Sequence, residues 1–121
     1  MTILYIDDDN EDQEFFFEAI GLINPLYKCI SASSGREGLK ILQTLTPDHI
    51  FLDLNMPEMN GKEVLLLIRA DKKLACVPVV IFSTSIHTED IGILKQNGAN
   101  ECMVKPVSFS ILCTMLKTYL N

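Results

Sequence analysis

The sequence predicts an α/β fold in which a doubly wound, parallel five-stranded sheet carries helices on both faces. Five short apolar runs alternate along the chain with five longer stretches whose apolar residues have helical spacing. Hydrophobic residues make up 48% and charged residues 21% of the 121 residues, which is typical of one globular core. No stretch has the composition of a linker, so residues 1–121 are expected to form a single domain.

The first two strand–helix units occupy the N-terminal third of the chain. Thr2–Ile6 is rich in β-branched residues and predicts a strand. Asn10–Ile23 has helical spacing, and Asn24-Pro25 ends that helix. Lys28–Ala32 is a second short strand. One of the two serines that follow it caps a helix over Gly35–Leu45.

The middle of the chain predicts two more strands around one helix. His49–Leu54 is hydrophobic enough to be buried on both faces of the sheet. Asn55–Gly61 is a loop rich in Pro, Asn and Gly, and Lys62–Ala70 is helical. Val77–Phe82 is the fourth strand, and its second residue is a proline, which a strand start tolerates.

The last third predicts a helix, a strand and a final helix. Thr88 caps the first of these helices and Gly98 ends it. Glu101–Val104 is the fifth strand, and Ser108 caps a helix that continues to Leu120. Five units are too few for a barrel of eight, so an open sheet is expected.

The charge balance and the cysteines indicate which classes of partner and which cellular compartment the protein is suited to. Lys and Arg number 10 against 16 Asp and Glu, and no basic residue precedes Lys28, which argues against nucleic acid as a partner. An acidic balance suits cations or a basic protein surface. The four cysteines form no CxxC pair and lie in apolar runs, so we expect small buried side chains in a reducing compartment. No run is long enough to cross a bilayer and no signal peptide is evident, which predicts a cytoplasmic protein without a membrane partner.

Polar side chains follow four of the five predicted strands, at the edge where sites form in such sheets. A single aspartate at a strand end is more often a turn former or helix cap, but four strand ends with complementary groups favour a shared site. These residues are Asp7, Asp8, Asp9, Asp53, Ser83, Thr84 and Lys105. Clustered carboxylates bind a hard cation such as Mg²⁺ or Mn²⁺. A carboxylate nucleophile, a metal and a lysine together suit an aspartyl-phosphate intermediate.

Other sites have weaker support in the sequence. Asp7, Asp9, Glu11 and Glu18 have a spacing superficially like an EF-hand loop, but the turn glycine and the preceding helix are missing. The two histidines have no metal-ligand neighbours, so both are interpreted as structural or solvated. No dinucleotide-binding, P-loop or GxSxG motif occurs. The Phe15-Phe16-Phe17 run is interpreted as packing, with one ring exposed.

Several longer motifs occur in a fixed order from Ile3 to the last helix. They are Ile3–Asp9, Ile50–Gly61, Val77–Ser85, Asn97–Ala99 and Lys105-Pro106. In this order and spacing the chain resembles the receiver domain of two-component response regulators. The Asp-Leu-Asn-Met-Pro and Ser-Thr-Ser segments are most similar to single-domain receivers of the chemotaxis type and to those paired with bacterial phytochrome kinases.

The resemblance implies a flavodoxin-like sheet with strand order 2-1-3-4-5 and a phosphoryl group accepted by Asp53. Asp8 would bind Mg²⁺ directly and Asp7 would bind it through water. Asp53 itself and the backbone carbonyl of Asn55 would complete the protein ligands of the metal.

The resemblance also assigns the surrounding groups. Ser83 would contact the phosphoryl oxygens and, with Thr84, take part in the switch. Lys105 would pair with the acidic site, and the Lys105–Pro106 bond would be cis. Cys102 stands where the family usually has a Tyr or Phe whose ring turns inward. The switch is therefore expected to involve Cys102 without the usual ring movement.

We therefore expect a stand-alone receiver, a phosphoacceptor with self-catalysed phosphotransfer and autodephosphorylation and not an enzyme with its own substrate. Its partners would be a sensor histidine kinase or phosphotransfer protein and a downstream protein target. A homodimer through the fourth helix, fifth strand and fifth helix is a further expectation. Two alternatives stay open: a Mg²⁺-dependent phosphatase with an aspartyl nucleophile, and a scaffold that is not phosphorylated. Phosphatases with an aspartyl nucleophile need an acidic residue two positions after the nucleophile, where this chain has Asn55.

Overall fold

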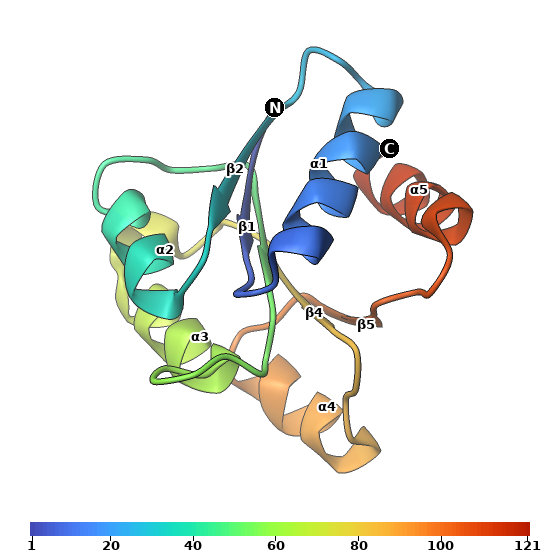
Figure 1. The fold of residues 1–121 in the computed structure, drawn as a ribbon. Helices are drawn as coiled ribbons and strands as arrows, with labels where there is room; N and C mark the ends of the chain where they lie inside the picture. The colour runs from blue at the N-terminus through green and yellow to red at the C-terminus, as the bar shows by residue number, and fades with distance from the viewer.

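The computed structural model describes residues 1–121 and contains one parallel sheet with the strand order β2-β1-β3-β4-β5 (Figure 1). The strands are β1 (Thr2–Ile6), β2 (Lys28–Ala32), β3 (His49–Leu52), β4 (Val79–Ser83) and β5 (Glu101–Val104). The helices are α1 (Asn10–Ile23), α2 (Gly35–Leu42), α3 (Gly61–Ala70), α4 (Thr88–Gln96) and α5 (Phe109–Leu120), and a 3₁₀ turn, η1, covers Lys72–Leu74. This architecture confirms the predicted α/β fold and strand order.

Two apolar clusters, one on each face of the sheet, hold the helices in place. α1 and α5 pack on one face over a cluster of 11 buried residues, and α2, α3 and α4 contribute to a cluster of 17 on the other. Figure 1 shows α1 and α5 together on one side of the strands and α2 and α3 on the opposite side. Successive strand residues point to opposite faces, so Leu4 and Ile6 join the larger cluster while Ile3 and Tyr5 join the smaller one.

The central strands are buried on both faces, as predicted for β3. Ile50, Phe51 and Leu52 of β3 have no exposed surface, and every residue of β4 is buried. In a sheet covered on both sides, continuous apolar runs are the pattern that satisfies burial. Polar residues of these strands therefore appear only where the strands end.

Three strand boundaries, one of β3 and two of β4, differ from the prediction because backbone pairing, not hydrophobicity, decides them. β3 ends at Leu52 and not at Leu54, since its pairing with β4 stops where Leu52 faces Ile81. β4 begins after Pro78, which has no N–H to donate to the ladder. At its other end β4 includes Ser83, which pairs with Val104.

Helix starts follow the predicted caps at two places: Ser34 and Ser108 cap α2 and α5 with their side-chain oxygens. Asp9 caps α1 in the same way, which was not predicted. Thr88 is not a cap: it is the first residue of α4, and His87 precedes it without a side-chain cap bond. Gly98 follows α4 with φ 110°, the left-handed conformation that a glycine adopts without strain.

Other helix bounds differ by a few residues. α2 ends at Leu42 and not at Leu45, because the threonines that follow are weak helix formers and Pro47 disfavours helical backbone before it. α3 begins at Gly61, one residue before the predicted start, and is capped by Asn60. The turn η1 was not predicted from the sequence.

Arg69, near the end of α3, connects the segments at the amino ends of β4 and β5. Its guanidinium donates to the carbonyl oxygens of Leu74, Val77 and Gly98 at 2.8–2.9 Å and to Oδ1 of Asn100 at 3.0 Å. Asn100 Oδ1 also accepts the N–H of Val79 at 2.9 Å. One planar side chain thus satisfies acceptors from the two connections that precede β4 and β5, on the edge of the sheet opposite the strand ends that carry the predicted polar residues.

Two expectations about side-chain burial were wrong in part. In the phenylalanine run only Phe16 is buried, and both Phe15 and Phe17 are exposed, since a single position falls on the buried stripe of α1. All four cysteines are free thiols, but Cys76 is exposed and the other three are half-buried. The cysteines are therefore less buried than the apolar residues beside them in the sequence had indicated.

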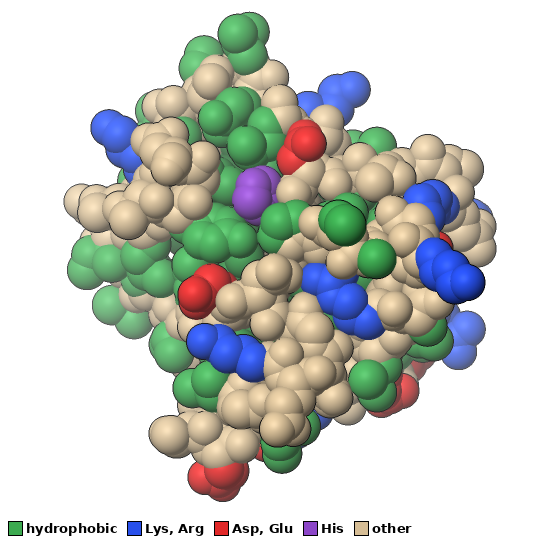
Figure 2. Space-filling view, turned by 180° about the vertical axis from the view of Figure 1, so that it is seen from behind, with side chains coloured by type: hydrophobic (Ala, Val, Ile, Leu, Met, Phe, Trp, Pro, Cys, Tyr) green, Lys and Arg blue, Asp and Glu red, His purple; other side chains and the backbone are tan.

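The face behind the view of Figure 1 carries a contiguous group of apolar side chains (Figure 2). A shallow groove on the β5 and α5 surface is lined by Met103, Ile111, Met115 and Tyr119. A homodimer through this region stays a prediction. None of the helices has the length and apolar character needed to cross a bilayer.

Candidate functional site

Three backbone hydrogen bonds place the chain just beyond the strands. The N–H of Asp7 donates to Ala32, that of Asp53 to Ile6, and that of Lys105 to Ser83, at 2.8–3.0 Å. Because β1 and β3 are neighbours in the sheet, Asp7 and Asp53 leave adjacent strand ends side by side. The predicted convergence of carboxylates at this edge is therefore present in the structure.

Asp7, Asp8 and Asp53 form a cluster that could hold a divalent cation. One carboxylate oxygen from each residue lies within 4.8 Å of the others. Asp7 and Asp53 are buried, whereas Asp8 is exposed and faces solvent. Opposite ligands of Mg²⁺ are about 4.2 Å apart, and the ion keeps several waters, so an open set of three carboxylates fits it in spacing and in donor chemistry.

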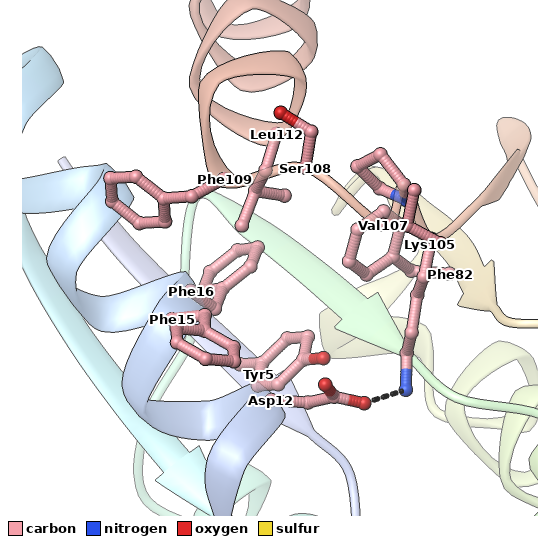
Figure 3. Close-up of a pocket in the computed structure, with 11 residues that line it drawn as sticks. Tyr5, Asp12, Phe15, Phe16, Phe82, Lys105, Val107, Ser108, Phe109 and Leu112 are labelled. Carbon is pink, nitrogen blue, oxygen red and sulfur yellow. Dashed lines mark hydrogen bonds and ion pairs between the residues drawn. The ribbon is translucent and has the colours of Figure 1, made fainter.

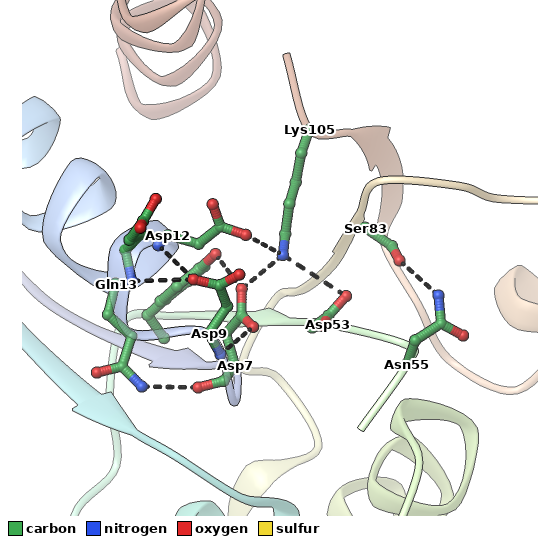
Figure 4. Close-up of polar contacts among 10 residues, drawn as sticks. Asp7, Asp9, Asp12, Gln13, Asp53, Asn55, Ser83 and Lys105 are labelled. Atoms are coloured by element: carbon green, nitrogen blue, oxygen red, sulfur yellow. Dashed lines mark hydrogen bonds and ion pairs between the residues drawn. The ribbon is translucent and has the colours of Figure 1, made fainter. Parts of the chain in front are cut away.

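Lys105 reaches into this cluster from the end of β5 (Figure 4). Its Nζ lies 2.6 Å from Asp7 Oδ2, 2.9 Å from Asp12 Oδ2 and 3.8 Å from Asp53 Oδ1. Burial alone would lower the pKa of Lys105, but the hydrogen bonds to Asp7 and Asp12 and the attraction of the carboxylates outweigh it, so the pKa is raised. The ammonium is therefore a permanent positive charge in the site.

Asp7 has a hydrogen-bond partner on each carboxylate oxygen. Oδ2 accepts the buried hydroxyl of Tyr5 at 2.6 Å as well as the Lys105 ammonium, and Oδ1 accepts the N–H of Asp9 at 3.0 Å. Gln13 donates to the backbone carbonyl of Asp7 at 2.7 Å. Burial and the nearby Asp7 carboxylate raise the pKa of Tyr5, so its hydroxyl keeps its proton and remains a donor. Asp7 is thus held in one orientation.

Asp53 is the second buried carboxylate of the cluster. Burial raises its pKa to about 6, Lys105 opposes that change, Asp7 adds to it, and hydrogen bonds with Ser83 and the backbone of Leu54 oppose it. At neutral pH the group is still mostly ionised, although poorly solvated. Such an oxygen is a stronger nucleophile than an ordinary surface carboxylate.

Ser83 and Asn55 flank Asp53 on the side away from Lys105. The amide nitrogen of Asn55 lies 3.4 Å from the buried hydroxyl of Ser83. Thr84, the next residue, is exposed. The Ser83 hydroxyl also hydrogen-bonds the Asp53 carboxylate and so lowers the pKa of Asp53, which places the hydroxyl beside any group bound to that carboxylate.

Gly61 supports the loop beneath Asp53. Its N–H donates to the carbonyl of Leu54 at 2.9 Å. A Cβ at this position would collide with the backbone carbonyl of Asp53 and the Cα of Leu54. At Gly61 the start of α3 therefore approaches the loop after β3 more closely than any other residue type would permit.

A cavity of about 340 Å³ adjoins the ammonium between α1 and the segment that links β5 to α5 (Figure 3). Most of its lining is aromatic or aliphatic, and Lys105, Asp12 and Ser108 supply the polar groups. Lys105 thus borders both the acidic cluster and this cavity.

The predicted residues Asp7, Asp8, Asp53, Asn55, Ser83 and Lys105 all lie at this edge. Sequence reasoning missed Asp12 and Tyr5. Tyr5 had a signal, because it precedes Asp7 by two positions and shares its face of the strand. The rejection of an EF-hand loop is confirmed, since Glu11 and Glu18 lie within helix α1 and not in a loop.

Two details depart from what the resemblance implies. All peptide bonds are trans, so the expected cis Lys105–Pro106 bond was wrong; trans is the lower-energy isomer before proline by about 0.5–1 kcal/mol, and Lys105 reaches Asp7 with it. Cys102 is half-buried against the larger core cluster, and burial raises the pKa of its thiol. The position at which the family usually has Tyr or Phe is therefore occupied by the small, protonated thiol of Cys102.

Comparison with known proteins identifies the family to which the chain belongs. Residues 3–117 match the model of the response regulator receiver domain. The probable C4-dicarboxylate response regulator DctR of Bacillus subtilis is 32% identical over 117 residues, which are 97% of this chain and 51% of DctR. The chain thus spans about half the length of that curated relative.

Solved structures agree with this result. The phosphorylated cyanobacterial phytochrome response regulator RcpA has a TM-score of 0.89 and 30% identity, over 98% of this chain and 89% of its own. The Mn²⁺-bound response regulator Rcp1 has a TM-score of 0.85 and 26% identity, over 97% of this chain and 89% of its own. With the fold, the polar edge of the sheet and the matched family model all in agreement, this chain belongs to the response regulator receiver domains of two-component signalling.

Proposed function

We propose that the protein accepts a phosphoryl group on Asp53 from the phosphohistidine of a sensor histidine kinase or phosphotransfer protein. The observation that carries this proposal is the position of Asp53: a buried, poorly solvated carboxylate 3.8 Å from a lysine ammonium and next to two further aspartates. That combination offers a nucleophile, a fixed positive charge and a place for a cation.

In the transfer step an oxygen of Asp53 attacks the phosphorus atom. A bond from that oxygen to phosphorus forms, the phosphorus–nitrogen bond breaks, and the imidazole leaves with the electron pair. Lys105 stabilises charge on one phosphoryl oxygen and Ser83 binds another. Mg²⁺ or Mn²⁺, held by Asp8, Asp53, the Asn55 carbonyl and, through water, Asp7, would neutralise further charge on the transferring group. Mn²⁺ binding by the similar regulator Rcp1 supports this ligand chemistry.

The acyl phosphate later hydrolyses when water attacks phosphorus and releases inorganic phosphate. While it lasts, the new charge draws the Ser83 hydroxyl and the exposed Thr84 toward the site and changes the loop between β4 and α4. The altered surface then binds a downstream protein. Cys102 packs beside this region and, as a thiol, cannot fill the space that a moving ring fills elsewhere.

Incubation with radiolabelled acetyl phosphate and Mg²⁺ tests the proposal. Wild-type protein should take up label stoichiometrically and lose it slowly, and Asp53→Asn should take up none. Lys105→Ala should take up label more slowly without unfolding. Glu18→Gln removes one exposed charge on α1 and should behave as wild type.

Three results would contradict the proposal. Label in Asp53→Asn would move the acceptor elsewhere. Continuous release of phosphate without a stable labelled protein would favour a phosphatase, and the absence of label in wild type would favour a scaffold. Removal of the metal with EDTA should prevent labelling of wild type.

A further inference from the structure

The Lys105 ammonium has two short contacts with carboxylates, and neither partner is the proposed acceptor. Asp7 and Asp12 accept from Nζ at 2.6 and 2.9 Å, while Asp53 lies at 3.8 Å, beyond hydrogen-bond distance. An ammonium has three N–H donors, so one remains after these two bonds. Figure 4 shows Asp53 across the ammonium from Asp12, where the remaining donor can face it.

We propose that Asp12 is a positioning residue for phosphorylation, and this inference rests on the proposed function of Asp53 and Lys105. Asp12 holds Nζ away from Asp53 and aims the third N–H at the space where a phosphoryl oxygen arrives. Without it, the ammonium moves onto the Asp53 carboxylate. The nucleophile is then paired directly with a cation, and the space for the phosphoryl oxygen is closed.

Asp12 is not needed for the usual tasks of an acid at a helix start. The N-cap is Asp9, whose Oδ1 accepts the N–H groups of Glu11 and Asp12 at 2.9 and 3.1 Å. Glu11 occupies the same first turn of α1 and supplies the same favourable charge to the helix dipole, yet its side chain is exposed and contacts no cation. What distinguishes Asp12 is its contact with Lys105, across 93 positions of sequence.

The contact geometry is favourable for a positioning role. The side chain of Asp12 is 29% exposed and that of Lys105 is 9% exposed, so the pair is only partly screened by water. Asp12 also connects α1 to the segment that follows β5, so the position of the ammonium depends on two elements and not on the flexible lysine stem alone.

A double-mutant cycle on labelling by acetyl phosphate tests the inference. Asp12→Ala should lower the maximal rate of labelling on the order of tenfold, as a displaced reacting group does, with little change in the acetyl phosphate concentration at half-maximal rate. Asp12→Asn, which keeps an acceptor oxygen, should retain an intermediate rate. Glu11→Ala should label as wild type does. In a Lys105→Ala background, Asp12→Ala should have no further effect.

A structure of the Asp12→Ala variant gives the second readout, with Nζ of Lys105 expected within hydrogen-bond distance of Asp53. An equal loss of rate in the presence and absence of Lys105 would show a structural role for Asp12 and overturn the inference. An unchanged or faster rate in Asp12→Ala would overturn it too, while wild-type labelling would leave the proposed function intact. If wild type takes no label, the proposed function fails and the positioning role fails with it.

Discussion

Replacement of Asp53 by asparagine should raise the free energy of unfolding at pH 8 and leave it nearly unchanged at pH 4. The folded state holds the Asp53 carboxyl with a pKa of about 6, above its ordinary value of 3.8. A raised pKa means that the folded state binds the proton more tightly than the unfolded state does. The contribution to stability is therefore present below about pH 4 and is lost as the pH rises through about 6.

The size of the effect follows from the pKa difference. The pKa rises from 3.8 to about 6, roughly two units, and each unit corresponds to about 1.4 kcal/mol. Asparagine has the shape of the protonated carboxyl but no charge. We therefore expect Asp53→Asn to be more stable than wild type by up to about 3 kcal/mol at pH 8.

Urea unfolding of both proteins in EDTA, at several values between pH 4 and pH 8, measures the difference directly. Burial lowers the pKa of His49, so protonation of His49 destabilises both proteins at low pH, and this contribution cancels in the difference. Glu18→Gln controls for the loss of one surface charge. If wild type and Asp53→Asn keep a constant difference from pH 4 to pH 8, the reasoning from burial is refuted. Added Mg²⁺ should stabilise wild type by binding its folded state and so reduce the gap.

Three further predictions concern the same edge of the sheet. Tyr5→Phe should destabilise the protein by about 1.5–3 kcal/mol in urea unfolding, because it removes a buried hydrogen bond to a carboxylate; a loss below 0.5 kcal/mol would contradict this. Titration with Mg²⁺ should shift amide resonances of residues 7–9 and 53–55, and shifts centred within α1 would contradict the cluster as the site. Addition of beryllofluoride should move the 84–88 loop more than the surroundings of Cys102, and a large rearrangement centred on Cys102 would show that the thiol does not limit the switch.

The strands and helices that hydrophobic patterns define were predicted from the sequence. The predictions failed for strand ends, which depend on backbone pairing, and for the isomer of the Lys105–Pro106 peptide bond. β3 was found because three consecutive apolar residues, Ile50–Leu52, precede Asp53, but its last residue depends on where β4 stops pairing. The trans bond before Pro106 could not be predicted, since the two isomers differ by only about 0.5–1 kcal/mol and tertiary contacts decide between them.

The residues of the candidate site that directly follow strands could be predicted from the sequence. Asp7, Asp53 and Lys105 follow strands directly, so topology alone brings them together. Asp12 lies in a helix, where an acid in the first turn already has an ordinary explanation in the helix dipole. Only the three-dimensional position of Lys105 shows that Asp12 does something else.

The Arg69 network at the opposite edge has a consequence for how the molecule opens. Its hydrogen bonds join the connections before β4 and β5, so these segments can separate only if several bonds break together. Native-state hydrogen exchange should therefore be slowest at amides such as Val79 and Asn100, which bond to this region, and faster in the 84–88 loop. Local opening free energy would then decrease from the amino edge to the carboxyl edge of the sheet, which lets the loop at the polar cluster change conformation while the far edge stays folded.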